Sequence, residues 1–134
     1  MKMVIDFPGG AKVDAHFGAY TLQTDQKPAD GGQGSAPTPF EVFLASLGTC
    51  AGIYVLGFCR KRGIPTEGIR IIQHSHPNPT TGMVEKVELE IQVPPSFPRE
   101  YYSALIRSAE LCKVKKTLEQ PPQFEIVTKE VQAS

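Results

Sequence analysis

The sequence predicts an α+β fold in which antiparallel strands surround one long helix. Three observations support this prediction. The 18 residues from Val42 to Cys59 carry no charged side chain, the segments on both sides alternate apolar and polar residues, and glycine- and proline-rich turns separate these segments. With 134 residues, the chain is long enough for a single domain, 1–134, with a modest core.

Three short strands are expected near the N-terminus, over residues 2–6, 11–17 and 19–24. Residues 11–17 alternate apolar and polar side chains, which is typical of a strand with one face in water. The connections Pro8–Gly10 and Gly18 are short and rich in turn formers. The three strands should therefore form an antiparallel meander.

The central helix is predicted from Pro39 to Gly63, after a loop over residues 25–37. Thr38 is a good N-cap, and Pro39 stands at the first helical position, where its missing N–H costs nothing. Glu41 completes a capping box because its carboxylate can accept the backbone N–H of Thr38. Gly63 is suited to end the helix.

A helix this apolar needs cover on several sides. Gly48 and Gly52 are four residues apart, so they share a face on which another backbone can approach closely, and we expect a partner helix there. The length also touches the lower limit for a membrane-spanning helix, with Arg60–Arg62 as a flank. Polar and small residues dilute its apolarity, however, and the other segments alternate as in soluble sheets. We therefore expect no membrane.

A second strand pair is predicted over residues 69–74 and 87–93, joined by the turn-rich segment 77–82. Its second strand alternates Val, Leu and Ile with Glu and Gln, which indicates one buried face. Three elements complete the chain: a helix from Pro98, a short helix after Cys112, and a strand over residues 124–131.

Composition argues against several classes of protein. The 14 basic and 14 acidic residues balance and form no basic stripe, so we expect no nucleic-acid partner. Asp6 interrupts the apolar run at the N-terminus, which is too short for a signal peptide. We therefore expect a cytoplasmic protein.

The three cysteines fit neither a disulfide framework nor a CxxC metal motif. Cys50 lies near the middle of the apolar helix, where burial alone would raise its pKa and make it inert. From the residues alone it is either core or a nucleophile near a positive group. Cys59 lies half a turn round the helix from Cys50, so we expect core or interface.

Cys112 has different neighbours, because Lys113, Lys115 and Lys116 follow it directly. Cations beside a thiol lower its pKa, although a solvated surface turn explains the same lysines. His74 and His76 would share one face of a strand, and His16 could join them as a third metal ligand. Such a pair is more often exposed surface, so we expect no metal and no cofactor.

Two stretches carry a resemblance to the OsmC/Ohr family: GGQGSAPTPFEVFLASLGTCAGIYV, which holds Cys50, and AELCKVKKTL, which holds Cys112 62 residues later. The order of strands and helices resembles that family over essentially the whole chain. The resemblance implies an intertwined homodimer, in which two long central helices pack together inside sheets from both chains.

The resemblance also implies that the protein reduces organic hydroperoxides. Cys50 would then be the peroxidatic thiolate, and Cys112 would resolve its sulfenic acid as a disulfide. An apolar substrate pocket lined by Phe43, Leu47 and Tyr54 would favour alkyl peroxides. An external dithiol, a lipoyl group or a thioredoxin-like protein, would reduce the disulfide.

Two positions differ from the peroxidase pattern. Those enzymes use an N-terminal arginine and a glutamate ten residues before the first cysteine, but this chain has no arginine before Arg60 and has Phe40 at that position. Lys12 or Lys27 could replace the arginine only as a point charge, and Glu41 is better explained by the capping box. The alternative is a non-catalytic dimer of this type that binds a small apolar ligand or senses oxidants.

Overall fold

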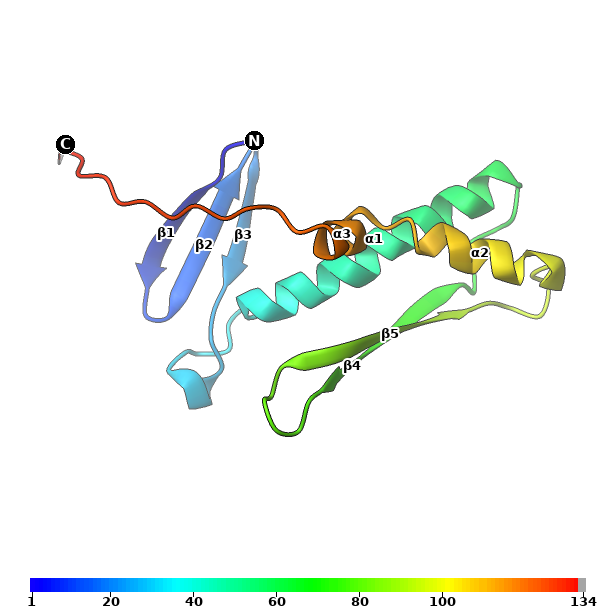
Figure 1. Cartoon of the computed structure of the whole chain (residues 1–134), viewed down its shortest axis with the longest axis horizontal. Helices are drawn as coiled ribbons and strands as arrows, with labels where there is room; N and C mark the ends of the chain where they lie inside the picture. Colours follow the sequence, from blue (N-terminus) through cyan, green and yellow to red (C-terminus); the bar gives the residue numbers. More distant parts are fainter. Residues whose placement is uncertain (133–134) are drawn as a thin grey trace. The chain divides into compact units, whose positions relative to one another are not determined.

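A computed structural model describes residues 1–132 and confirms the α+β fold class (Figure 1). The elements are β1 (Val4–Gly9), β2 (Lys12–Phe17), β3 (Tyr20–Thr24), η1 (Pro28–Asp30), α1 (Pro39–Lys61), β4 (Arg70–Pro77), β5 (Val84–Gln92), η2 (Arg99–Tyr101), α2 (Tyr102–Ala109) and α3 (Lys113–Glu119). They form two compact units. The first holds residues 1–49 and 71–90, and the second holds residues 50–70 and the described chain from residue 91 onward.

The N-terminal strands form the predicted antiparallel sheet in the order β1-β2-β3. Ile5, Ala15 and Leu22 lie opposite one another across the three strands. They share one face because side chains alternate along a strand. That apolar face is open to solvent in the single chain, where Ile5 is 53% exposed.

The loop before α1 is organised around one buried carboxylate, that of Asp25, which is 1% exposed. It accepts hydrogen bonds from the backbone N–H groups of Gln26 at 2.8 Å and Ser35 at 3.1 Å, and from the Ser35 hydroxyl. These bonds lower the pKa of Asp25 from 3.8 to about 2, the Ser35 hydroxyl contributing most. The Asp25 N–H donates to the Pro37 carbonyl at 3.2 Å and so closes the loop just before α1.

The capping box at the start of α1 is confirmed. The backbone N–H of Thr38 donates to Glu41 Oε1 at 2.9 Å, and the backbone N–H of Glu41 donates to Thr38 Oγ1 at 3.2 Å. At the other end, the N–H of Ile64 donates to the Cys59 carbonyl at 2.9 Å. Gly63 allows this because its φ of +64° lies in the left-handed region.

A buried stripe runs along α1. Its members recur every three or four residues, as on one face of a helix: Leu47, Ala51, Val55, Phe58 and Cys59. The helix is long and apolar enough to cross a membrane by length and composition, and only 28% of its apolar window is buried within the chain. Ile53, off the stripe, is 59% exposed.

The space beside Gly48 is occupied by a residue of the same chain, while a partner helix on the face shared by Gly48 and Gly52 stays a prediction. The side-chain oxygen of Gln73 in β4 lies where a Cβ at position 48 would stand. The Gln73 amide also donates to the Leu44 carbonyl at 2.8 Å. The missing side chain therefore makes room for a bond between strand and helix.

The predicted hairpin is present as the two-stranded sheet β4-β5. Its turn is closed by the N–H of Asn78, which donates to the Met83 carbonyl at 2.7 Å, and by Gly82 at a φ of +73°. Helix η2 follows Pro98 and continues directly into α2.

The last predicted strand differs from the structure, because residues 124–131 form no strand. Their apolar side chains are open to water, with Ile126 95% exposed and Phe124 85% exposed. A strand needs a neighbouring strand to satisfy its backbone groups. The alternation of apolar residues was real, but no described strand of this chain pairs with the segment.

Candidate redox site

The second unit brings the two predicted redox cysteines together. Cys50 lies on α1, and Cys112 occupies the N-cap position of α3, just after the end of α2. Cys50 is half-buried and Cys112 is 3% exposed. Neither of them forms a disulfide in the described part of the chain, and nor does Cys59.

Helix α2 is fixed to the second half of α1 by apolar and polar contacts. Leu105 of α2 is 3% exposed, and the ring of Tyr101, the last residue of η2 directly before α2, meets the Phe58 ring edge to face at 5.9 Å. The Ser108 hydroxyl donates to the Tyr54 carbonyl at 3.2 Å. Cys112 follows one turn after Ser108, so these contacts hold the segment that carries Cys112 beside α1.

The Cys50 sulfur faces the start of α3. It accepts hydrogen bonds from the backbone N–H groups of Val114 and Lys113 and from the Cys112 thiol. These N–H groups are available because the first backbone hydrogen bond of α3 runs from Lys116 to Cys112, at 3.0 Å.

The pKa of Cys50 is therefore lowered from the ordinary thiol value, chiefly by the Val114 N–H. The Cys112 thiol, the Lys113 N–H and the Lys113 charge add to this effect, while partial burial opposes it. Cys50 is thus the thiol of the pair that ionises first.

The other two thiols are shifted in the opposite direction. Burial raises the pKa of Cys112, and the neighbouring Cys50 adds to the rise. Burial also raises the pKa of Cys59, which is fully buried, against the charge of Arg62. Cys50 therefore loses its proton more readily than the Cys112 thiol beside it, while Cys59 belongs to the core as expected.

The predicted supporting residues have other described roles. Glu41 completes the capping box, and the charge of Lys27 acts on Glu41, whose pKa is lowered mainly by its hydrogen bonds with Thr38. Lys12 lies in β2 of the first unit. Since these three residues belong to the first unit, their action on Cys50 stays a prediction. The groups described as acting on Cys50 are two backbone amides, the Cys112 thiol and the Lys113 charge.

Sequence reasoning missed these amides, although a signal for them was present. A short helix was predicted directly after Cys112, and the first N–H groups of any helix lack partners within it. Backbone N–H groups occur in every residue except proline, so looking for an arginine or lysine side chain does not reveal them.

The predicted pocket residues all lie on α1. Phe43 and Leu47 belong to the first unit and Tyr54 to the second. Leu47 is 8% exposed, while Phe43 and Tyr54 are half-buried. Phe40, at the position of the missing glutamate, stacks on Phe43 with ring centres 5.6 Å apart. A substrate pocket lined by these residues stays a prediction.

Metal-ligating groups gather at a different place from the one considered in the sequence. Ligand atoms of Asp6, Asp14 and His16 lie within 4.8 Å of one another on the N-terminal sheet, and His74 and His76 are not part of this group. His16 Nε2 lies 3.1 Å from Asp6 Oδ2, and His16 Nδ1 lies 3.1 Å from the Thr21 hydroxyl. Hydrogen bonds within the chain therefore already hold the His16 ring between Asp6 and Thr21.

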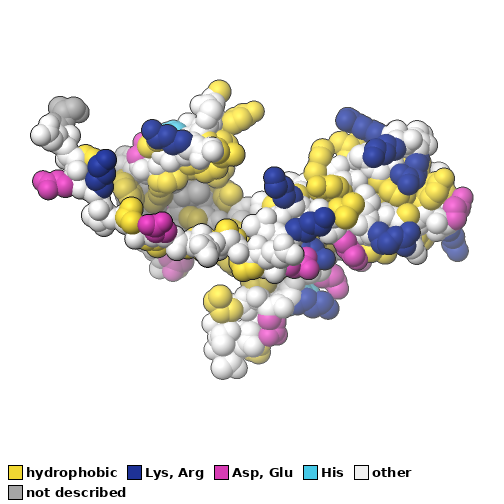
Figure 2. Space-filling model, turned by 45° about the horizontal axis from the view of Figure 1, so that its top comes forward, with side chains coloured by type: hydrophobic (Ala, Val, Ile, Leu, Met, Phe, Trp, Pro, Cys, Tyr) yellow, Lys and Arg dark blue, Asp and Glu magenta, His cyan; other side chains and the backbone are white. Residues whose placement is uncertain are grey.

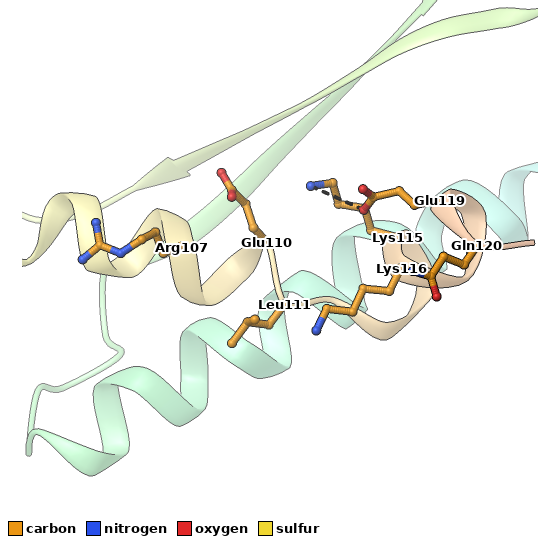
Figure 3. Close-up of a pocket in the computed structure, with 7 residues that line it drawn as sticks. All are labelled: Arg107, Glu110, Leu111, Lys115, Lys116, Glu119 and Gln120. Atoms are coloured by element: carbon orange, nitrogen blue, oxygen red, sulfur yellow. Dashed lines mark ion pairs between the residues drawn. The ribbon is translucent and has the colours of Figure 1, made fainter.

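An open pocket lies between α2 and α3 (Figure 3). Leu111 supplies an apolar side chain, and Lys115 and Glu119 form an ion pair at 3.9 Å.

Basic residues of the second unit outnumber its acidic residues by 10 to 6, whereas the first unit has 4 basic and 8 acidic residues. Figure 2 shows Lys and Arg side chains gathered at the right of the view, over α2 and the end of α1. Cys50 and Cys112 thus lie in the basic unit.

Comparison with known proteins shows the family of the chain. The family model for OsmC-like proteins matches residues 32–127, a stretch that contains both Cys50 and Cys112. The chain belongs to the OsmC-like family. Among curated proteins, none matches the sequence.

Solved structures share the fold of this OsmC-like protein at low sequence identity. A putative osmotic stress induced and detoxification response protein from Psychrobacter arcticus matches with a TM-score of 0.74 and 18% identity, over 87% of each chain. The organic hydroperoxide resistance protein OhrB of Bacillus subtilis matches with a TM-score of 0.52 and 15% identity, over 90% of this chain and 93% of that chain. An organic hydroperoxide resistance protein OsmC from Legionella pneumophila matches with a TM-score of 0.50 and 18% identity, over 88% and 89%.

Proposed function

We propose that this OsmC-like protein is a thiol-dependent peroxidase that reduces organic hydroperoxides. One observation supports the proposal most directly: the Cys50 sulfur accepts hydrogen bonds from two amides and from the thiol of Cys112. Donors aimed at a sulfur stabilise its thiolate, and the thiolate is the nucleophilic form. The neighbouring thiol then stands where a resolving cysteine is needed.

The proposed reaction has two steps, oxidation of Cys50 by the hydroperoxide and formation of the Cys50–Cys112 disulfide. The Cys50 thiolate attacks the terminal oxygen of the hydroperoxide, the O–O bond breaks, and the alkoxide leaves and takes up a proton to become the alcohol. Cys50 is oxidised by two electrons to the sulfenic acid. The Cys112 sulfur then attacks the Cys50 sulfur, the S–O bond breaks, and the hydroxyl leaves with the Cys112 proton as water.

The substrate class is supported by side chains and by relatives. Phe43, Leu47 and Tyr54 would offer an apolar surface on the helix that carries Cys50, which favours an alkyl group over the more polar hydrogen peroxide. Two of the matched structures are named as organic hydroperoxide resistance proteins.

The remaining parts of the proposal concern partners and location. The disulfide would be reduced by an external dithiol, either a lipoyl group or a thioredoxin-like protein, in the cytoplasm, where such reductants keep thiols reduced. The active form would be a homodimer, since α1 and the segment 124–131 leave apolar side chains exposed in one chain. Fractionation of cells tests the location, and pull-down with each dithiol carrier tests the reductant.

The enzymatic proposal is tested by counting thiols. Reduced protein is mixed with one equivalent of cumene hydroperoxide, and free thiols are titrated beside the variants Cys50→Ser, Cys112→Ser and Cys59→Ser. Wild type and Cys59→Ser should each lose two thiols. Cys112→Ser should lose one thiol, as a sulfenic acid that dimedone traps, and Cys50→Ser should lose none.

Repeating the experiment with excess peroxide and a dithiol separates the enzyme from the alternative, a dimer that only binds an apolar ligand or senses oxidants. An enzyme turns over many equivalents of peroxide when a dithiol is supplied. A sensor stops after one disulfide, and a binding protein loses no thiols at all.

A further inference from the structure

We infer that Ser108 is a positioning residue that holds Cys112 within reach of Cys50. The inference rests on the proposed function in assigning Cys112 the resolving role. It stands on the hydrogen bond from the Ser108 hydroxyl to the Tyr54 carbonyl, 3.2 Å long, which joins α2 to α1.

The place of this bond relative to the cysteines gives it its role. Tyr54 lies one helical turn after Cys50 on α1, and Ser108 lies four residues before Cys112. The bond is therefore about one turn away from the thiol pair on both partners.

Backbone bonds carry the constraint from Ser108 to Cys112. The N–H of Leu111 donates to the Ser108 carbonyl at 3.1 Å, and the N–H of Cys112 donates to the Ala109 carbonyl at 3.3 Å. Ser108 is thus tied to α1 through its side chain and to the turn carrying Cys112 through its backbone. Loss of the side-chain bond would leave that turn free to move away from Cys50, so resolution would slow.

The attack of Cys50 on an oxidant needs no contact with the Cys112 sulfur, whereas closure of the disulfide does, so loss of the Ser108 bond should slow closure more than attack. A residue with a merely structural role would lower stability and affect both steps alike. Alanine is also a better helix former than serine, which offsets part of the stability lost with the bond. The ratio of the two rates is therefore the informative quantity.

The test uses oxidised glutathione as the probe, so that it does not depend on peroxide. The Cys50 thiolate attacks one sulfur of the probe and releases one glutathione thiolate. Deprotonated Cys112 then attacks the Cys50 sulfur of the mixed disulfide and releases the second. Quenched mass spectrometry follows both steps in the full chain, and thermal unfolding is measured in parallel.

Ser108→Ala should slow closure of the Cys50–Cys112 disulfide about fivefold more than it slows formation of the mixed disulfide, the factor that corresponds to one hydrogen bond. Ser108→Thr, which keeps a hydroxyl, should restore closure. Ser103→Ala, an exposed serine of the same helix, is the matched control. Closure of Ser108→Ala at the wild-type rate, or equal slowing of both steps, would overturn the inference. If wild type completes both steps with this probe but ignores peroxide, only the proposed function fails.

Discussion

Val114 is the residue whose backbone affects the pKa of Cys50 most strongly. Its N–H is the largest influence lowering the pKa of Cys50, so the activating group cannot be removed by truncating a side chain. Proline removes the N–H, and the first turn of a helix tolerates it. Val114→Pro therefore isolates the amide.

Val114→Pro should raise the pKa of Cys50 and lower its rate of alkylation at pH 7 by about 3- to 10-fold, since one pKa unit is a factor of ten in thiolate. Alkylation of Cys50 by iodoacetamide across pH, followed by mass spectrometry, measures this. Val114→Ala keeps the N–H and is the control. An unchanged titration in the proline variant would show that the amide does not activate Cys50.

Asp25 gives a pH prediction at the same scale. Its pKa falls from 3.8 to about 2 on folding, so the carboxylate stabilises the fold above pH 3.8, and this contribution is lost as pH falls toward 2. Asp25→Asn should be less stable than wild type at pH 7, and the difference should disappear near pH 2. Urea unfolding at several pH values checks this, and a difference that does not change with pH would contradict it.

Among the elements, α1 was predictable almost to the residue because its start and end signals are local. The capping box at Thr38 and Glu41 and the glycine at position 63 act within one turn of the chain. The cysteine pair was predictable from its sequence surroundings. The side chain that fills the space beside Gly48 was not predictable, because it is that of Gln73, which lies in a strand 25 residues further along the chain.

Gly48 and Gln73 can be tested as a pair. Alanine at position 48 gains about 1 kcal/mol of helix propensity but displaces the Gln73 side chain from its bond to Leu44, so Gly48→Ala alone should be close to neutral. In a Gln73→Ala background the same change should stabilise by about 1 kcal/mol. Denaturant unfolding of the four proteins measures the coupling. Strong destabilisation in both backgrounds would instead indicate a backbone of another chain against Gly48.

The strand predicted over residues 124–131 shows the limit of local patterns. The alternation in FEIVTKEV defines which side chains share a face, but it cannot name the neighbouring strand that would supply the backbone hydrogen bonds. The same limit applies to the amides that face Cys50. Every residue except proline has a backbone N–H, so the residue type does not reveal which N–H groups act on Cys50.

At the scale of the whole molecule, exposed apolar side chains favour a homodimer. Phe7 on the N-terminal sheet is 81% exposed and Ile126 is 95% exposed in the single chain, and large exposed apolar surface marks interaction sites. Light scattering at micromolar concentration should give twice the chain mass of 14.6 kDa. A monomeric mass would refute the dimer without touching the thiol chemistry.

The central claim is that Cys50 and Cys112 form one redox pair. The most direct measurement is peptide mapping, by mass spectrometry without reduction, of protein treated with one equivalent of cumene hydroperoxide. The account predicts one disulfide between Cys50 and Cys112, with Cys59 still free. Three free thiols after treatment, or a disulfide that includes Cys59, would contradict it.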